Sequence, residues 1–212
     1  MILAVSVGEI IPTNAYFYID DTTSKCLLVD PGGNAEKLLA VIDERKLAVE
    51  KILLTHGHFD HMGAAQTLQD HLDVPIVMHE NGRAYATNAE WNLSAVYGME
   101  LTLENVTYLP DNSKITLAAN PAFGVTLRHV PGHTTDGAIY VCADNRAAFV
   151  GDCIFKNSYG NTSFFGGDEK TLLTNIKRRI LTLPDETVLL SGHSEPTTVG
   201  AEKNRPWYAF AD

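Results

Sequence analysis

The segment Thr55-His56-Gly57-His58-Phe59-Asp60-His61 places three histidines and an aspartate within six residues, 56–61. The short apolar run before it, Lys51–Leu54, predicts a buried strand. In an extended chain, residues two apart point to the same side. His56 and His58 can therefore face one metal ion together.

Asp60 and His61 come next, at the start of an expected amphipathic helix, Met62–Leu72. Asp60 alone could serve that helix, because carboxylates are favoured at helix N-termini. Three histidines and an aspartate so close together rarely serve packing. We therefore interpret the whole run as a metal-binding segment.

Three further candidates stand singly, each after a glycine that follows an expected strand. The strands are Val125–Val130, Ala147–Val150 and Thr187–Leu190, and the candidates are His133, Asp152 and His193. A lone residue in such a turn is commonly structural, so the signal lies in the repeated context. Together with the first segment they make five imidazoles and two carboxylates. This set can hold two divalent metals, which produce hydroxide at neutral pH.

These motifs resemble those of metallo-β-lactamase-fold hydrolases, in the glyoxalase II-like (hydroxyacylglutathione hydrolase-like) branch. The resemblance covers nearly the whole chain and rests on Thr55–Ala65, Val130–Thr134, Gly151-Asp152, Gly160–Asp168 and Ser191–Pro206. It implies an α+β fold, a four-layer αββα sandwich of two mixed sheets flanked by helices. The pattern of strands and helices fits packed layers, but the layer order comes from the resemblance alone.

The resemblance also implies how the ligands are divided. The first metal would be held by His56, His58 and His133, the second by Asp60, His61 and His193, and Asp152 would bridge the two. Asp60 and Asp152 would also be the catalytic carboxylates. The implied cofactors are two divalent metal ions, with zinc first and iron or manganese as alternatives.

Length and composition predict one domain over residues 1–212, since 45% of the residues are apolar. Full-length glyoxalase II enzymes append a helical domain that helps to bind glutathione. The chain stops soon after the His193 segment, and we expect that domain to be missing. Three cysteines, an odd number, argue against a disulfide framework. Lactamases of this fold place a cysteine ligand near Cys153, but Asp152 fits the Gly-Asp motif better.

The net charge of −10 and the lack of a Lys/Arg stripe argue against a nucleic-acid substrate. The N-terminus has no basic region typical of a signal peptide, and no apolar run is long enough to span a membrane. We expect a small-molecule substrate, no membrane partner and a cytoplasmic location. The oligomeric state stays open.

Substrate candidates follow Asp152. Relatives that act on glutathione thioesters commonly carry Gly-Arg-Thr-Asp where this chain has Gly160-Asn161-Thr162-Ser163. An amide at Asn161 cannot replace the bidentate charge of an arginine, so we expect weak glutathione recognition. Tyr159, Asn161 and Lys203 are taken as substrate-binding candidates. Asp136, which precedes a glycine, is interpreted as a turn residue.

The expected activity is hydrolysis of a thioester, with a lactone second. A persulfide dioxygenase is an alternative, because such enzymes share the motif and use one iron at positions that match His56, His133 and Asp152. A metal-binding relative without activity is the third possibility. The complete second set of ligands favours hydrolysis.

Overall fold

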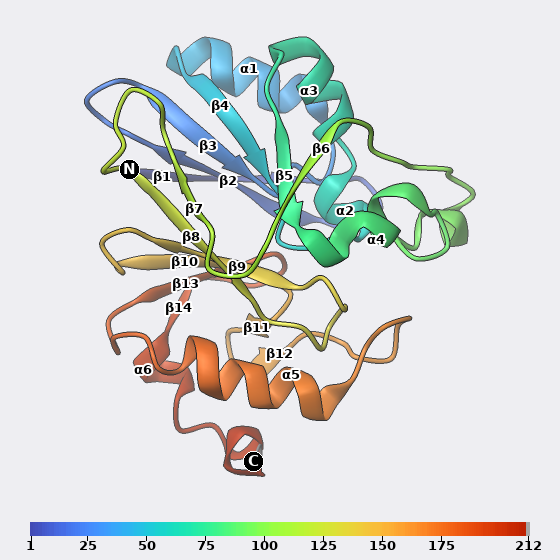
Figure 1. Cartoon of the computed structure of the whole chain (residues 1–212), viewed down its shortest axis with the longest axis vertical. Helices are drawn as coiled ribbons and strands as arrows, with labels where there is room; N and C mark the ends of the chain where they lie inside the picture. The colour runs from blue at the N-terminus through green and yellow to red at the C-terminus, as the bar shows by residue number, and fades with distance from the viewer. Residues whose placement is uncertain (211–212) are drawn as a thin grey trace.

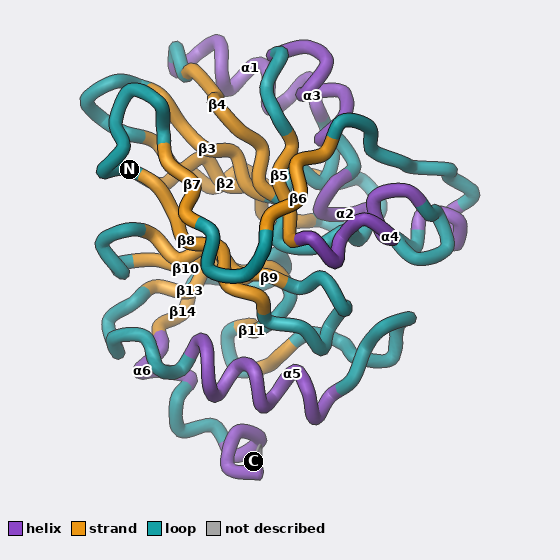
Figure 2. The backbone as a smooth tube through the Cα atoms, viewed as in Figure 1, coloured by secondary structure: helices purple, strands orange, loops and turns teal. Residues whose placement is uncertain are grey.

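Two six-stranded sheets face each other in the computed structural model, which describes residues 1–210, and helices cover both outer faces (Figure 1). Figure 2 shows the strands in the two inner layers and most of the helix in the two outer ones. The expected αββα sandwich of two mixed sheets is confirmed. No helix among residues 1–210 has the length and apolar character needed to cross a bilayer.

The first sheet has the order β1-β2-β3-β4-β5-β6. Its strands are β1 (Ile2–Val7), β2 (Thr13–Ile19), β3 (Lys25–Val29), β4 (Ala48–Leu53), β5 (Ile76–His79) and β6 (Val106–Leu109). β1 to β3 are antiparallel, and β3 to β6 are parallel.

The second sheet has the order β14-β13-β10-β9-β8-β7. Its strands are β7 (Lys114–Thr116), β8 (Gly124–His129), β9 (Ala138–Cys142), β10 (Ala147–Gly151), β13 (Val188–Ser191) and β14 (Thr197–Thr198). A small hairpin, β11 (Ile154–Phe155) and β12 (Ser158–Tyr159), stands apart from it.

Helices of several kinds connect these strands. The α-helices are α1 (Ala35–Arg45), α2 (Phe59–Met62), α3 (Ala65–Leu72), α4 (Arg83–Thr87), α5 (Glu169–Asn175) and α6 (Val199–Glu202). The 3₁₀ turns are η1 (Glu80–Gly82), η2 (Ser94–Tyr97) and η4 (Pro206–Phe210), and η3 (Ile176–Ile180) is a π-helical turn.

Three apolar cores correspond to the three interfaces between the four layers. Leu38 of α1 and Leu68 of α3 pack on the outer face of the first sheet. Leu27 and Phe149 lie between the two sheets. Leu172 of α5 packs on the outer face of the second sheet. Each strand of the sandwich therefore has one face toward helices and one toward the other sheet, as layered packing requires.

The expected helix Met62–Leu72 is divided into α2 and α3, because another loop approaches its backbone. Ala64 donates its N–H to the carbonyl of Pro31 at 2.8 Å, outside the helix. A Cβ on Gly63 would stand 2.4 Å from the carbonyl oxygen of Gly32. Side-chain periodicity does not report such a backbone contact, so it could not predict the break.

Candidate metal centre

The strand directions bring the candidate ligands to one edge of the sandwich. β8, β10 and β13 run the same way, since β8 and β10 each pair antiparallel with β9 and β10 pairs parallel with β13. Their carboxyl ends therefore meet at one edge, where the chain continues to His133, Asp152 and His193. β4 ends just before His56 and supplies the remaining segment from the first sheet.

The first cluster consists of three buried imidazoles. Nδ1 of His58 lies 3.1 Å from Nε2 of His56 and 3.1 Å from Nε2 of His133. All three residues are at most 3% exposed. Three ring nitrogens thus point at one small volume, as expected for the first metal.

The second cluster contains Asp60, His61 and His193. Nε2 of His193 lies 3.1 Å from Oδ2 of Asp60 and 3.3 Å from Nε2 of His61. Oδ2 of Asp60 is 3.7 Å from Nε2 of His61. These ligand atoms all lie within 4.8 Å of one another, which is compatible with a shared ion.

Asp152 lies between the clusters. Its Oδ1 is 3.2 Å from Nε2 of His61, and its Oδ2 is 3.4 Å from Nε2 of His193 and 3.6 Å from Nε2 of His133. One carboxylate thus reaches ligands of both clusters. The structure brings together all seven residues of the expected set.

In two of the histidines, the ring nitrogen that faces away from the site is hydrogen-bonded, which leaves the other nitrogen free to bind a metal. Nδ1 of His133 donates to the Asn161 carbonyl at 2.6 Å, and Nδ1 of His193 donates to the Pro12 carbonyl at 2.9 Å. In a neutral ring this leaves Nε2 as a bare lone pair toward the site. Buried Oδ1 of Asp152 faces Nε2 of His61 at 3.2 Å. Lone pairs that face one another in a buried site fit a shared cation.

The pKa shifts in the two clusters also indicate a site for metal ions. Burial, with the neighbouring His133, lowers the pKa of His58 to about 3, so this ring is neutral, as a ligand must be. Burial opposes the charged form of His193 too, but Asp152 and Asp60 outweigh it and raise its pKa to about 10. The buried carboxylates therefore demand positive charge, which bound metal ions would supply.

Asp30 is a supporting residue that sequence reasoning missed, because the segment Asp30-Pro31-Gly32-Gly33 is typical of a plain turn. Its Oδ2 accepts from Nδ1 of His61 at 3.0 Å and from Oγ1 of Thr55 at 2.6 Å. Oγ1 of Thr55 in turn lies 3.2 Å from Nδ1 of His56. One carboxylate therefore orients a ligand of each cluster. Its place at the end of β3, beside β4, was the available signal.

Asp136 is more than the turn residue expected from sequence. Its side chain is buried, and Oδ2 accepts from the N–H of Gly57 at 2.9 Å. Gly57 lies between His56 and His58, so this bond fixes the backbone that carries both ligands. Burial raises the pKa of Asp136 to about 7. Asp136 and Gly57 are 79 positions apart in the sequence, so the residues next to Asp136 could not reveal this contact.

The three substrate-binding candidates lie in different places. Asn161 lines the cavity at the metal centre. Tyr159 and Lys203 do not line it: Tyr159 donates its hydroxyl to Glu169 at 2.6 Å, and Lys203 pairs with Asp185 at 2.9 Å.

Cys153 is buried in the core beneath the second sheet, and its Sγ donates to the Val130 carbonyl at 3.6 Å. It belongs to none of the ligand clusters.

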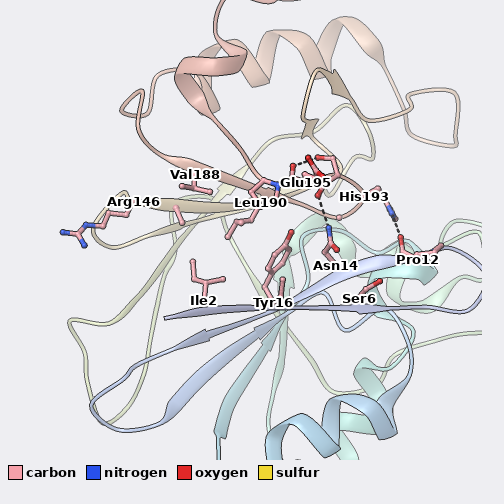
Figure 3. A pocket seen from close by; sticks show the side chains of 15 residues that line it. Ile2, Ser6, Pro12, Asn14, Tyr16, Arg146, Val188, Leu190, His193 and Glu195 are labelled. Atoms are coloured by element: carbon pink, nitrogen blue, oxygen red, sulfur yellow. Dashed lines mark hydrogen bonds between the residues drawn. The ribbon is translucent and has the colours of Figure 1, made fainter. Parts of the chain in front are cut away.

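Two cavities meet at His193. The smaller, about 380 Å³, contains His58, Asp60, His133 and Asp152 in its wall. The larger, about 770 Å³, is a groove between the sheets (Figure 3). At one end of this groove His193 is bonded to Pro12, and Arg146 lies at the other end. The smaller cavity holds the candidate chemistry.

Comparison with known proteins gives the family. The family model of the Metallo-beta-lactamase superfamily matches residues 9–193. The chain belongs to this superfamily. It is 36% identical to the probable metallo-hydrolase YqgX of Bacillus subtilis, over 92% of this chain and 91% of the relative. It is 34% identical to the hydroxyacylglutathione hydrolase GloC of Haemophilus influenzae, over 92% and 94%.

Two solved structures are similar to this chain over almost their full length. The B3 metallo-β-lactamase BLEG-1 has a TM-score of 0.90 and 33% identity, over 98% of this chain and 99% of that one. TTHA1623 in a di-iron-bound form has a TM-score of 0.83 and 31% identity, over 96% and 98%. With the ligand clusters, these likenesses support a metal-dependent hydrolase with a binuclear type of site.

Proposed function

We propose that this protein hydrolyses a thioester, with lactones as the second substrate class. The observation that carries the proposal is the complete second cluster, Asp60, His61 and His193, which shares Asp152 with the first. A mononuclear oxidative enzyme has no need of that cluster. The name of the Haemophilus influenzae relative supports a thioester as substrate.

The chain's own residues would hold and orient the reacting groups. His56, His58 and His133 would bind one ion, Asp60, His61 and His193 the other, and Asp152 both; zinc is the first choice, with iron or manganese as alternatives. Such ions supply activated water at neutral pH and polarise a carbonyl oxygen.

Two carboxylates stand at the reacting region. Asp152 lies between the clusters and would position the water there. Asp60, whose Oδ2 accepts from Oγ1 of Thr13 at 3.4 Å and lies 3.1 Å from Nε2 of His193, would hold the second ion and help to orient that water. Asp30 would keep His61 in the required orientation throughout. No separate nucleophilic side chain is needed.

The test combines metal analysis with two assays on the same preparation. We expect about two metal equivalents per chain, since the seven ligands satisfy two ions with room for water. Thioesters should be cleaved without oxygen uptake. One tightly held iron, persulfide-dependent oxygen uptake and no thioester cleavage would instead establish the dioxygenase alternative.

The partner that fits this proposal is a small molecule. The cavity of about 380 Å³ is of a size that suits a small ligand. The chain's charge of −10 disfavours nucleic acid, and we propose neither nucleic acid nor a membrane as partner.

A further inference from the structure

The mouth of the metal-site cavity is apolar. Its wall includes Leu93, Val96 and Tyr97, and on the other side Phe155 and Phe164. Val96 is 74% exposed, Tyr97 44% and Phe164 39%. Exposed apolar residues that gather in one place mark a binding surface, whereas scattered ones need no explanation.

Most of the exposed large apolar side chains lie in or next to this cavity. Six large apolar side chains are exposed in the described part of the chain: Met1, Ile10, Val96, Tyr97, Phe164 and Phe165. Three of them line the cavity, and Ile10 and Phe165 are chain neighbours of the lining residues Ile11 and Phe164. Met1 alone has no such relation to the cavity.

Hydrogen bonds of a buried side chain fix the backbone of the wall formed by residues 92–97. Asn92 is fully buried and donates to the carbonyls of Tyr85 at 3.0 Å and Leu101 at 2.8 Å, while its Oδ1 accepts from the N–H of Ser94 at 3.0 Å. Leu93 between them has a φ of 67°, which costs free energy for a leucine. Such a conformation persists only when its surroundings impose it.

The opposite wall, formed by Phe155 and Phe164, packs against two of the candidate metal ligands. The ring of Phe164 lies edge-on to His58, with centroids 5.7 Å apart, and that of Phe155 lies 6.1 Å from His193. The adjacent Phe165 packs on Trp91 at 4.3 Å, which joins the two walls. A substrate that reaches the ligand clusters must therefore pass between apolar surfaces.

No lysine or arginine lines this cavity, and its charged side chains besides histidine are Asp60 and Asp152. Three cations of the neighbouring segments already have acidic partners: Lys156 pairs with Glu195, Lys203 with Asp185 and Arg205 with Glu202. An anionic leaving group such as glutathione would find no counter-charge in the cavity wall.

We propose that the substrate of this site is a thioester with an apolar acyl chain and an uncharged thiol portion, and that Val96, Tyr97 and Phe164 bind the acyl chain. The proposal rests on the thioesterase function proposed above. Burying one methylene contributes about fourfold in affinity, so kcat/KM rises with chain length until the mouth is filled.

The test is a matched series of substrates on the metal-loaded protein. Acetyl, butanoyl, hexanoyl and octanoyl groups are each joined to N-acetylcysteamine, which is neutral, and to glutathione, which is anionic. We expect kcat/KM to rise by roughly two- to fourfold per methylene in the neutral series. At each length the glutathione thioester should be cleaved less efficiently than the neutral one, because the carboxylates of glutathione are repelled by a chain of net charge −10 and meet no lysine or arginine in the cavity wall. A flat profile, or a preference for glutathione at every length, overturns the proposal while the thioesterase function stands.

Two matched valine variants locate the acyl chain. Val96→Ser should flatten the dependence on chain length. Val188→Ser should leave it unchanged, because Val188 lines the inter-sheet groove of Figure 3 and not the metal-site cavity. Thermal unfolding shows whether each variant is folded. If Val188→Ser flattens the profile and Val96→Ser does not, the acyl chain lies in the groove and the proposed residues are wrong.

A binding measurement separates this inference from the catalytic one. The thioether S-octyl-N-acetylcysteamine cannot be hydrolysed, and calorimetry should show binding with a negative heat-capacity change that Val96→Ser reduces. Binding of this kind without cleavage of any thioester would refute the proposed function and retain the apolar site. Cleavage of thioesters without such binding would support the proposed function and refute the apolar site.

Discussion

Asp152 contacts ligands of both clusters, so its loss should affect both ions. In Asp152→Ala the neighbouring His61 and His193 lose the carboxylate that lies 3.2 and 3.4 Å away. We expect turnover to fall by at least ~100-fold and metal content to fall with it. Metal analysis and steady-state kinetics check this. Asp144→Ala is the control, since Asp144 is 54% exposed and pairs with Arg146 at 3.7 Å; equal losses in both variants would mean that Asp152 has no special role.

Asp136 gives a second prediction at this scale. Asp136→Ala removes the acceptor for the N–H of Gly57 and leaves that buried donor unpaired. We expect the affinity for the first metal to fall by ~10–100-fold, as for other groups that support ligands. Asp136→Asn keeps an oxygen acceptor and should restore most of it. Competition with a chelator of known affinity measures both, and unchanged affinity in the alanine variant would refute the role.

The raised pKa of Asp136 also predicts a dependence of stability on pH. Burial favours the protonated form and raises the pKa from 3.8 to about 7 in the folded protein. This contribution is fully present below about pH 4 and is lost as the pH rises through 7. Relative to Asp136→Asn, the wild type should therefore lose up to ~4 kcal/mol between pH 4 and pH 8. Denaturant unfolding across this range checks it, and parallel curves would contradict it.

At the scale of elements, the strand ends need glycines for a steric reason. A Cβ on Gly192, just after β13, would stand 2.5 Å from Cε1 of His61 and 2.7 Å from Oδ1 of Asp152. Both side chains are held by close contacts: Nδ1 of His61 is bonded to Oδ2 of Asp30 at 3.0 Å, and Oδ1 of Asp152 lies 3.2 Å from Nε2 of His61. The turn thus brings backbone and ligands closer together than any other residue would allow.

Gly192→Ala should therefore disturb the second cluster more than the first. We expect the metal content to fall from about two ions to about one, with the remaining ion at the cluster of His56, His58 and His133. Gly98→Ala is the control: Gly98 has a φ of 71° but nothing within 4 Å of an added Cβ. That variant should lose about 1 kcal/mol of stability and keep both ions. Two retained ions in Gly192→Ala would contradict the steric argument.

The whole molecule should be more stable with metal than without it. The clusters combine loops from both sheets, so bound ions would tie the two halves of the sandwich together. Each ion at a free concentration of ~100 times its Kd adds ~2.7 kcal/mol, or roughly 5–10 °C in Tm for a chain of this size. Chelation followed by calorimetry tests this. An unchanged Tm after verified removal of metal would show that the ions do not support the fold.

The sequence by itself determined the ligand types and most of the elements. The spacing in His56–His61 and the glycine turns before His133 and His193 are local patterns, and local patterns predict strand ends and ligand chemistry. The strands β8, β10 and β13 begin and end within one residue of the expected positions, because apolar runs depend on nearby residues. The layer order came from resemblance to a family.

Only the tertiary structure decided which distant groups support the site. Asp30 reaches His61 across 31 positions, and Asp136 reaches Gly57 across 79. Single aspartates near glycines are equally common in plain turns, so their neighbours in sequence cannot distinguish the two cases. The apolar mouth, too, joins residues near 96 to those near 164, which become neighbours only once the two sheets have packed. Burial and contact between distant residues are properties of the packed chain, and they assign these roles.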